Sequence, residues 1–222
     1  MEPDRRKAIF EDLPVWQAVC RQIVPAIASQ LIILLYNLAD AYFVGMLNRP
    51  EQTAALTVSI SAFLMLTAIS NLFGVGGASA MARALGRKEP ERAKALAAVS
   101  IRGGLAAGFL YAAAVALSGR QLLTLCGATA DTLDTAVRYI RWTVVIGGPF
   151  SVMSMLLSNL IRAEGRAEAA SFGVMLGCVL NILLALTDWL SPLYGLMWVQ
   201  PIVDTVAVVV ALWLFRRLPE EN

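Results

Sequence analysis

The sequence contains no histidine, little charge and only three cysteines. Without histidine, no side chain titrates near neutrality at its ordinary pKa, so any proton chemistry must fall on an aspartate or glutamate. Cys20, Cys126 and Cys178 are too far apart for a CxxC metal site and too few for a disulfide framework. No nucleophile–base set or glycine-rich phosphate loop is present. We therefore expect a protein that is not an enzyme and needs no metal site or cofactor.

Charged residues make up only 15% of the 222 residues, hydrophobic ones make up 58%, and the mean hydropathy is +0.67. A soluble domain carries about 25% charged residues, so this composition predicts a protein in lipid. One bilayer crossing needs about 20 apolar residues. Six apolar stretches meet that length, which predicts an all-α, polytopic bundle of about six transmembrane helices at 23–47, 54–82, 95–118, 138–161, 168–188 and 194–215. Residues 1–22 are then an amphipathic lead-in, residues 23–217 a single membrane lobe and residues 218–222 a tail.

The basic residues are unequally divided between the two sides of these stretches. Thirteen lie in the N-terminal tail, the loops after the second and fourth stretches and the C-terminal tail, whereas four lie on the other side and Arg102 lies within the third stretch. The positive-inside rule therefore puts both termini in the cytoplasm and requires an even number of crossings. The basic residues are spread over several loops, so nucleic acid is not an expected partner.

The first apolar stretch contains three polar residues on one helical face, Tyr36, Asn37 and Asp40. A carboxylate at the bilayer centre costs about 2.5–3.5 kcal/mol on insertion scales, unless it faces a polar cavity or takes up a cation. A carboxylate removed from water favours its protonated form, and it is also a hard oxygen ligand for a small cation. Asp40 is therefore expected to bind a coupling ion, a proton or sodium, helped by Asn37, Tyr36 and Asn181. A simple hydrogen bond to a neighbouring helix is the alternative.

Three further polar residues lie in the later stretches, Asn181, Gln200 and Asp204. With Asp40 they fall in the outer half of the membrane, since a helix rises about 1.5 Å per residue. If these helix faces turn inward, the four residues build a polar pocket open to the outside. Each could instead satisfy a neighbouring helix, and Asp204 could satisfy backbone groups freed by Pro201.

Glycines mark two other regions. Residues 74–80 (GVGGASA), with Gly103, Gly104 and Gly108, predict close helix packing. The sequence Gly147-Gly148-Pro149 predicts a bend in the fourth helix, which is either a hinge for alternating access or a fixed kink.

Several blocks resemble one transporter family. PAIASQ at 25–30 and YNLADAYFVG at 36–45 look like the first helix of the MATE (multidrug and toxic compound extrusion) family. Residues 74–79 with 83–86 resemble its second helix and following loop, and SNLIRAEG at 158–165 resembles the end of its fourth helix. The blocks follow in the family's order, and the similarity covers residues 15–184.

The resemblance implies an antiporter of the bacterial cytoplasmic membrane that exports small organic, chiefly cationic, substrates in exchange for protons or sodium. It implies that Asp40 is the acid of helix 1 and Asn181 the asparagine of helix 5. The sequence departs from the family at Ala185, where an acid is common, and Asp188 lies one turn too far to replace it.

Length is a second departure, because the resemblance implies twelve helices in two lobes and this sequence holds one lobe. Residues 195–204 look more like the family's last helix than its sixth, which suggests an internal deletion around 185–194. A homodimer or a complementary lobe would complete the transporter. The alternatives are a remnant that does not transport and, ranked lower, a lipid or polysaccharide precursor flippase, for which Arg102 is the one candidate basic residue in a cavity.

Overall fold

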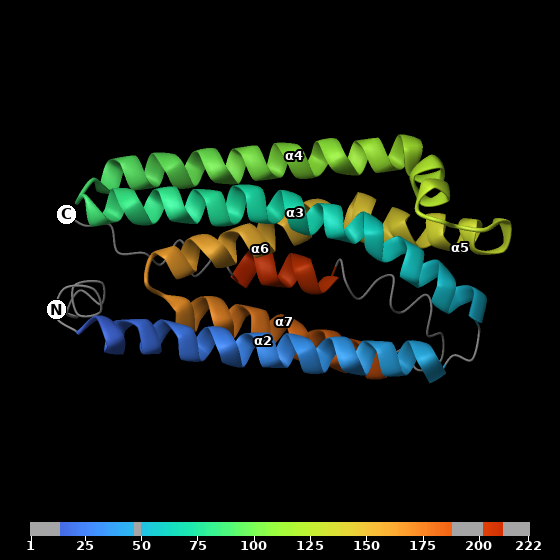
Figure 1. Cartoon of the computed structure of the whole chain (residues 1–222), viewed down its shortest axis with the longest axis horizontal. Helices are drawn as coiled ribbons and strands as arrows, with labels where there is room; N and C mark the ends of the chain where they lie inside the picture. Colours follow the sequence, from blue (N-terminus) through green and yellow to red (C-terminus); the bar gives the residue numbers. More distant parts are fainter. Residues whose placement is uncertain (1–13, 47–49, 188–201, 211–222) are drawn as a thin grey trace.

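The computed structural model describes residues 14–46, 50–187 and 202–210, and all regular structure in these residues is helical. The long elements are α2 (Val15–Met46), α3 (Pro50–Gly86), α4 (Pro90–Leu125) and α7 (Ala167–Thr187). Between α4 and α7 lie α5 (Ala130–Ile140), the π-helix η1 (Arg141–Ile146) and α6 (Gly148–Ala163), and a last helix covers 202–210. The elements lie side by side along one direction (Figure 1). The prediction of an all-α membrane bundle is therefore confirmed.

Within the residues that the structure describes, two helices are long and apolar enough to cross a membrane, Thr53–Gly86 and Pro90–Leu125. The pair Ala130–Ile146 and Gly148–Ala163 passes the same test together and is bent by 48° at its break. Six crossings stay a prediction, because only part of the last stretch is described. The helices α2, α3 and α4 are longer than the corresponding apolar stretches, and helical structure begins at Ala130, before the fourth stretch at 138–161. The reason is that backbone hydrogen bonding continues into the polar ends of a helix outside the lipid.

The helix ends follow from local sequence. Proline begins α3 at Pro50 and α4 at Pro90, where its missing N–H costs no hydrogen bond. Glycine with positive φ follows α4 at Gly127 (φ 95°) and α6 at Gly165 (φ 81°). After α4, the Ala128 N–H donates to the Leu123 carbonyl at 2.9 Å, which closes the last turn.

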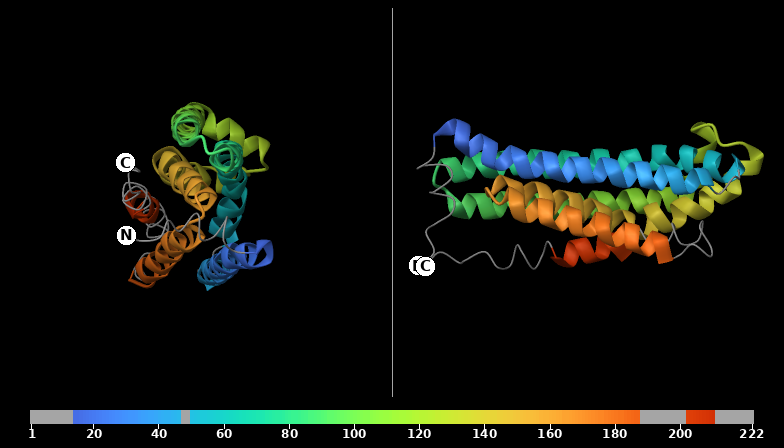
Figure 2. Two further views of the ribbon diagram at one scale, coloured as in Figure 1. Left: turned by 90° about the vertical axis from the view of Figure 1, so that its left-hand side faces the viewer. Right: turned by 90° about the horizontal axis from the view of Figure 1, so that it is seen from below.

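The helices divide into two groups. α3 packs against α4, α5 and α6, while α2 packs along α7, and contacts between α6 and α7 join the two groups. Figure 2 shows the two groups end on, with α2 at the edge of the molecule. The apolar core lies in the first group, where the largest fully buried side chains include Leu66, Leu123, Ile140 and Leu156.

Glycines allow α3, α4 and α6 to approach closely. A Cβ atom at Gly77 would lie 2.0 Å from Ser100 Oγ, and one at Gly104 would lie 2.4 Å from Leu156 Cδ1. Gly76, one residue away from Gly77, has open space around it. The close packing predicted for these glycine runs is therefore found, although not at every glycine.

Candidate functional site

A serine pair joins the helices that carry Asp40 and Asn181. Ser29 of α2 and Ser171 of α7 are both buried, and their hydroxyl oxygens lie 3.5 Å apart, at the long limit of a hydrogen bond. The Ser29 hydroxyl donates to the Ala26 carbonyl at 2.9 Å, so Ser171 is the donor to Ser29. α2 and α7 run in the same direction along their contact (Figures 1 and 2).

This register brings two predicted site residues to the same level. Asp40 follows Ser29 by eleven residues and Asn181 follows Ser171 by ten, so both stand about 15–17 Å beyond the serine pair. The backbone therefore places Asp40 and Asn181 at one height on neighbouring helices.

The remaining residues of the predicted coupling group lie on the same backbone. Tyr36 and Asn37 precede Asp40 within α2 by four and three residues. The side chains of these three residues and of Asn181 are outside the described part of the structure, as is the whole of Gln200. The roles predicted for these five residues stay predictions.

Asp204 is described, and it is buried. Only 9% of the residue is exposed, and the Ser151 hydroxyl of α6 donates a hydrogen bond to its carboxylate. The preceding Val203 lies against α7, where a Cβ atom at Gly177 would be 3.5 Å from Val203 Cγ1. Residues 202–210 therefore occupy a groove between α6 and α7, with Asp204 directed at α6.

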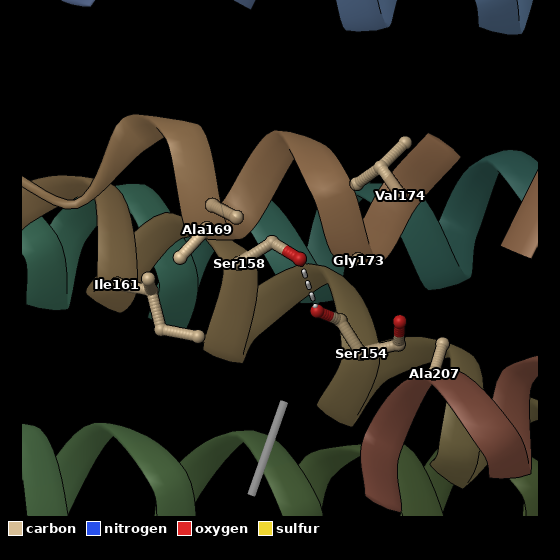
Figure 3. Close-up of a pocket in the computed structure, with 8 residues that line it drawn as sticks. Ser154, Ser158, Ile161, Ala169, Gly173, Val174 and Ala207 are labelled. Atoms are coloured by element: carbon tan, nitrogen blue, oxygen red, sulfur yellow. Dashed lines mark hydrogen bonds between the residues drawn. The ribbon is translucent and has the colours of Figure 1, made fainter. Parts of the chain in front are cut away.

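Two more serines follow Ser151 on α6, and sequence reasoning missed all three. Ser151, Ser154 and Ser158 are spaced three and four residues apart, which puts them on one face of the helix. Ser154, Ser158 and Ala207 line a small cavity of about 10 Å³, which is near the lower limit for one water molecule (Figure 3). The Ser158 hydroxyl donates to the Ser154 carbonyl at 2.9 Å. The buried Asp204 carboxylate thus lies at the N-terminal end of this row of three serine hydroxyls on α6.

The bend of the fourth predicted helix lies next to this acid. η1 ends at Ile146, Gly147 follows, and α6 begins at Gly148 with Pro149 in its first turn. A Cβ atom at Gly148 would lie 3.2 Å from both Cδ atoms of Leu66, so α6 packs tightly on α3 there. Ser151 is in the first turn after the bend, and its N–H donates to the Gly147 carbonyl at 2.9 Å. The helix is bent where Gly147, Gly148 and Pro149 predict it; that this bend is a hinge stays a prediction.

The remaining basic candidate, Arg102, lies away from these groups. It is exposed on α4, opposite the buried stripe that includes Ser100 and Gly104. Within the described residues, no three histidine, cysteine, aspartate or glutamate side chains are grouped for a metal ion. The hydrogen bonds described above, Ser171 to Ser29 and Ser151 to Asp204, thus join α7 to α2 and α6 to residues 202–210.

Comparisons with known proteins agree on one family. A sequence profile of the family described as MatE matches residues 25–187. Multidrug export protein MepA of Staphylococcus aureus (strain NCTC 8325) is 28% identical over 181 residues, which are 82% of this chain and 40% of MepA.

The solved structures of this family have the same fold as the chain. A MATE in complex with MaD5 has a TM-score of 0.83 and 27% identity, covering 99% of this chain and 48% of that one. A multidrug resistance MATE family transporter of the MOP superfamily in an outward-facing conformation has a TM-score of 0.81 and 27% identity, covering 96% of this chain and 46% of that one. The chain spans less than half the length of these relatives.

Proposed function

Because the chain belongs to the MATE family, we propose that it forms one lobe of a membrane exporter. Its substrates are small organic molecules, chiefly cations, which it exchanges for protons or sodium. The relatives named as multidrug export protein and multidrug resistance transporter support the substrate class. The observation that carries the proposal is the register of α2 on α7, fixed by the buried serine pair, which puts the backbones of Asp40 and Asn181 at one level about 15–17 Å beyond that pair.

Asp40 is the proposed coupling residue, assisted by Asn181, Asn37 and Tyr36. A carboxylate between membrane helices alternates between a protonated, neutral form and a charged form that must be hydrated or bind a cation. Amide and phenol groups nearby hydrogen-bond either form, so they lower the cost of the change. A cationic substrate and the coupling ion then compete for the same negative charge on Asp40. This competition is the basis of the exchange of substrate for ion.

Asp204 is proposed as the second acid of this lobe, taking the place of the acid absent at Ala185. Its hydrogen bond to Ser151 links it to the first turn of α6 after the bend. A change in the charge of Asp204 would alter that bond and so the packing of residues 202–210 on α6. Gly147, Gly148 and Pro149 are the proposed hinge for such a movement.

The substrate pocket is proposed to need a second lobe. The cavity between α6, α7 and residues 202–210 measures about 10 Å³, whereas small-molecule pockets measure about 300–1,000 Å³. An exposed, mainly apolar face runs along the first half of α2 and includes Ile23, Ile27 and Leu31. A second copy of the chain or a complementary lobe would cover this face. Insertion of both lobes in one orientation would make such pairing possible.

The test is proton-gradient-driven uptake of ethidium into inside-out vesicles that contain the full chain. An Asp40→Asn variant inserted to the same level is compared with Asp134→Asn, which makes the same chemical change at an exposed residue of α5. We expect uptake by the parent chain and by the Asp134 variant, and loss of at least tenfold, about 1.4 kcal/mol, in the Asp40 variant.

Equal uptake by all three chains would overturn the role of Asp40. No uptake by any of them, with normal insertion, would favour the remnant over a lobe that transports alone. Co-expression of two differently tagged copies, followed by pull-down of one tag, then separates a homodimer from a lobe that needs another polypeptide. The position of Arg102 outside the polar groups gives the flippase alternative no support.

A further inference from the structure

Three of the four basic residues of α4 are ion-paired. Arg92 pairs with Glu89 at 3.2 Å, Lys94 with Glu91 at 3.0 Å and Arg120 with Asp134 at 3.0 Å. Arg102 is exposed, and no acidic side chain of the described residues pairs with it. A guanidinium is charged at all relevant pH values, so Arg102 carries an unneutralised positive charge on the outer side of the helix.

Arg102 also lies deeper along α4 than the paired residues. α4 has 36 residues, so it is about 54 Å long against a hydrocarbon core of about 30 Å. If the length of α4 that exceeds the hydrocarbon core is divided equally between the two sides, about 12 Å of helix projects from the core at each end. Arg102 is twelve residues after Pro90, about 18 Å along, and so about 6 Å inside the hydrocarbon boundary. Arg120 is five residues before Leu125, about 8 Å from that end, and lies outside the boundary.

The neighbours of Arg102 along the same side of α4 are apolar and exposed. Val99 is 66% exposed, Phe109 58% and Leu117 90%, and the spacings of these residues repeat the helical period. An exposed apolar helix surface of this kind is suited to contact with lipid. A charge on such a surface is tolerated when the long side chain reaches the headgroup level.

The direction of the Arg102 side chain on the helix favours contact with the lipid headgroups. Side chains on a helix lean toward its N-terminus. For α4 the N-terminus is Pro90, at the membrane surface nearer to Arg102. The basic loop between α3 and α4 lies at that same surface, with Arg87 and Lys88, and the positive-inside rule places it in the cytoplasm. The cytoplasmic leaflet carries the anionic lipids.

We propose that Arg102 binds the phosphate of an anionic phospholipid of this leaflet, whose acyl chains lie along Val99, Ala106 and Phe109. The site needs neither Asp40 nor a second lobe, so it is independent of the transport proposal. The lipid supplies the negative charge that Glu89, Glu91 and Asp134 supply to the other basic residues of α4.

The experiment titrates dioleoylphosphatidylglycerol and dioleoylphosphatidylcholine into the purified full chain in detergent, and native mass spectrometry counts the bound lipids. An Arg102→Gln variant is compared with Arg102→Lys, which keeps the charge, and with Arg120→Gln, which removes a paired charge from the same helix. We expect Arg102→Gln to weaken phosphatidylglycerol binding about fivefold, since one basic residue near an anionic headgroup contributes about 1 kcal/mol. Arg102→Lys should retain most of the affinity, and Arg120→Gln should change it less than twofold.

Three results would overturn the proposal. The first is unchanged phosphatidylglycerol binding by Arg102→Gln at the parent's helix content. The second is an equal loss in the Arg120→Gln variant, which would indicate a general effect of charge. The third is full competition by an excess of inorganic phosphate, which would identify a site for small anions and not for a lipid. A loss of self-association in Arg102→Gln with lipid binding unchanged would assign this surface to a second copy instead.

Discussion

The two helix groups of this lobe differ in the contacts between their helices. In the group of α3, α4, α5 and α6, glycines and small residues bring backbones close, as at Gly77 against Ser100 and Gly104 against Leu156, and the Tyr111 hydroxyl of α4 also donates to a carbonyl of α3 at 2.9 Å. In the group of α2, α7 and residues 202–210, the contacts between helices include polar ones, the Ser29–Ser171 pair and the Ser151–Asp204 hydrogen bond to α6.

This difference has a physical consequence for movement. Close-packed surfaces resist sliding, because any shift forces atoms into overlap. Hydroxyl and carboxylate contacts are directional, and they can be broken and remade at a cost of about 0.5–1.5 kcal/mol each when neutral. The glycine-packed group is therefore expected to act as a rigid body, and the polar group to contain the parts that respond to ions.

The strongest test of the rigid group is Gly77→Ala. The added Cβ atom would lie 2.0 Å from Ser100 Oγ and 2.6 Å from Ser100 Cβ, so α3 and α4 must separate. We expect a loss of about 2–3 kcal/mol, the upper part of the range for overpacking. The measurement is the thermal unfolding midpoint of the purified protein in detergent.

The chain offers a matched control one residue away. Gly76→Ala puts the same methyl group into open space and should stabilise the helix by up to about 1 kcal/mol, as alanine does in place of glycine. A second change, Ser100→Gly, removes both atoms that Gly77→Ala would meet, so the double variant should recover most of the loss. Equal midpoints for Gly76→Ala and Gly77→Ala would show that the close approach is not what holds this group together.

On the polar side, Ser151→Ala removes the donor to the buried Asp204 carboxylate. Hydrogen bonds to charged groups contribute about 1.5–3 kcal/mol when buried, and other contacts of Asp204 remain, so we expect about 1–2 kcal/mol. In the transport assay the variant should also lose rate, because the proposal links Asp204 to the bend. Ser158→Ala is the control, since its hydroxyl donates within α6 to the Ser154 carbonyl. A full transport rate with a lowered midpoint would make Ser151 a structural residue only.

Local features of this lobe were predictable from sequence. Proline at Pro50 and Pro90 begins helices, Gly127 and Gly165 follow their ends, and the helix bends at Gly147 because its residues favour a break. Each of these features depends on one residue's own backbone, so a single sequence contains the information.

The polar contacts between helices were not predictable in the same way. Ser151 and Asp204 are 53 positions apart in the sequence. Whether they meet depends on the rotation of α6 about its axis, which the preceding π-helix sets. The ends of the helices cannot be taken from the apolar stretches for a related reason, because such stretches indicate where lipid begins and not where backbone hydrogen bonding ends. The spacing of Ser151, Ser154 and Ser158 was the available signal, but serines at helical spacing also occur as small packing residues.

A smaller effect is expected at the start of α6, within the first group, with Gly148→Ala. The added Cβ atom would lie 3.2 Å from the two Cδ atoms of Leu66, which are the far end of a flexible side chain. We expect a loss of about 0.5–1 kcal/mol, because Leu66 can shift by a few tenths of an ångström but is itself fully buried. If the bend is a hinge, the transport rate should fall by more than this stability change explains. A rate that falls only with stability would favour a fixed kink.

The smallest effect is expected where neither kind of helix contact operates, at the ion pair between Arg120 of α4 and Asp134 of α5. Both side chains are largely exposed, at 65% and 75%, so water and salt screen their attraction. Arg120→Gln should lower the stability by less than about 0.5 kcal/mol, and the difference should vanish in high salt. The measurement is the same unfolding midpoint at low and high ionic strength. A loss as large as that of Gly77→Ala would mean that this end of the lobe is held by charge, and α5 would then have to be taken out of the rigid apolar group.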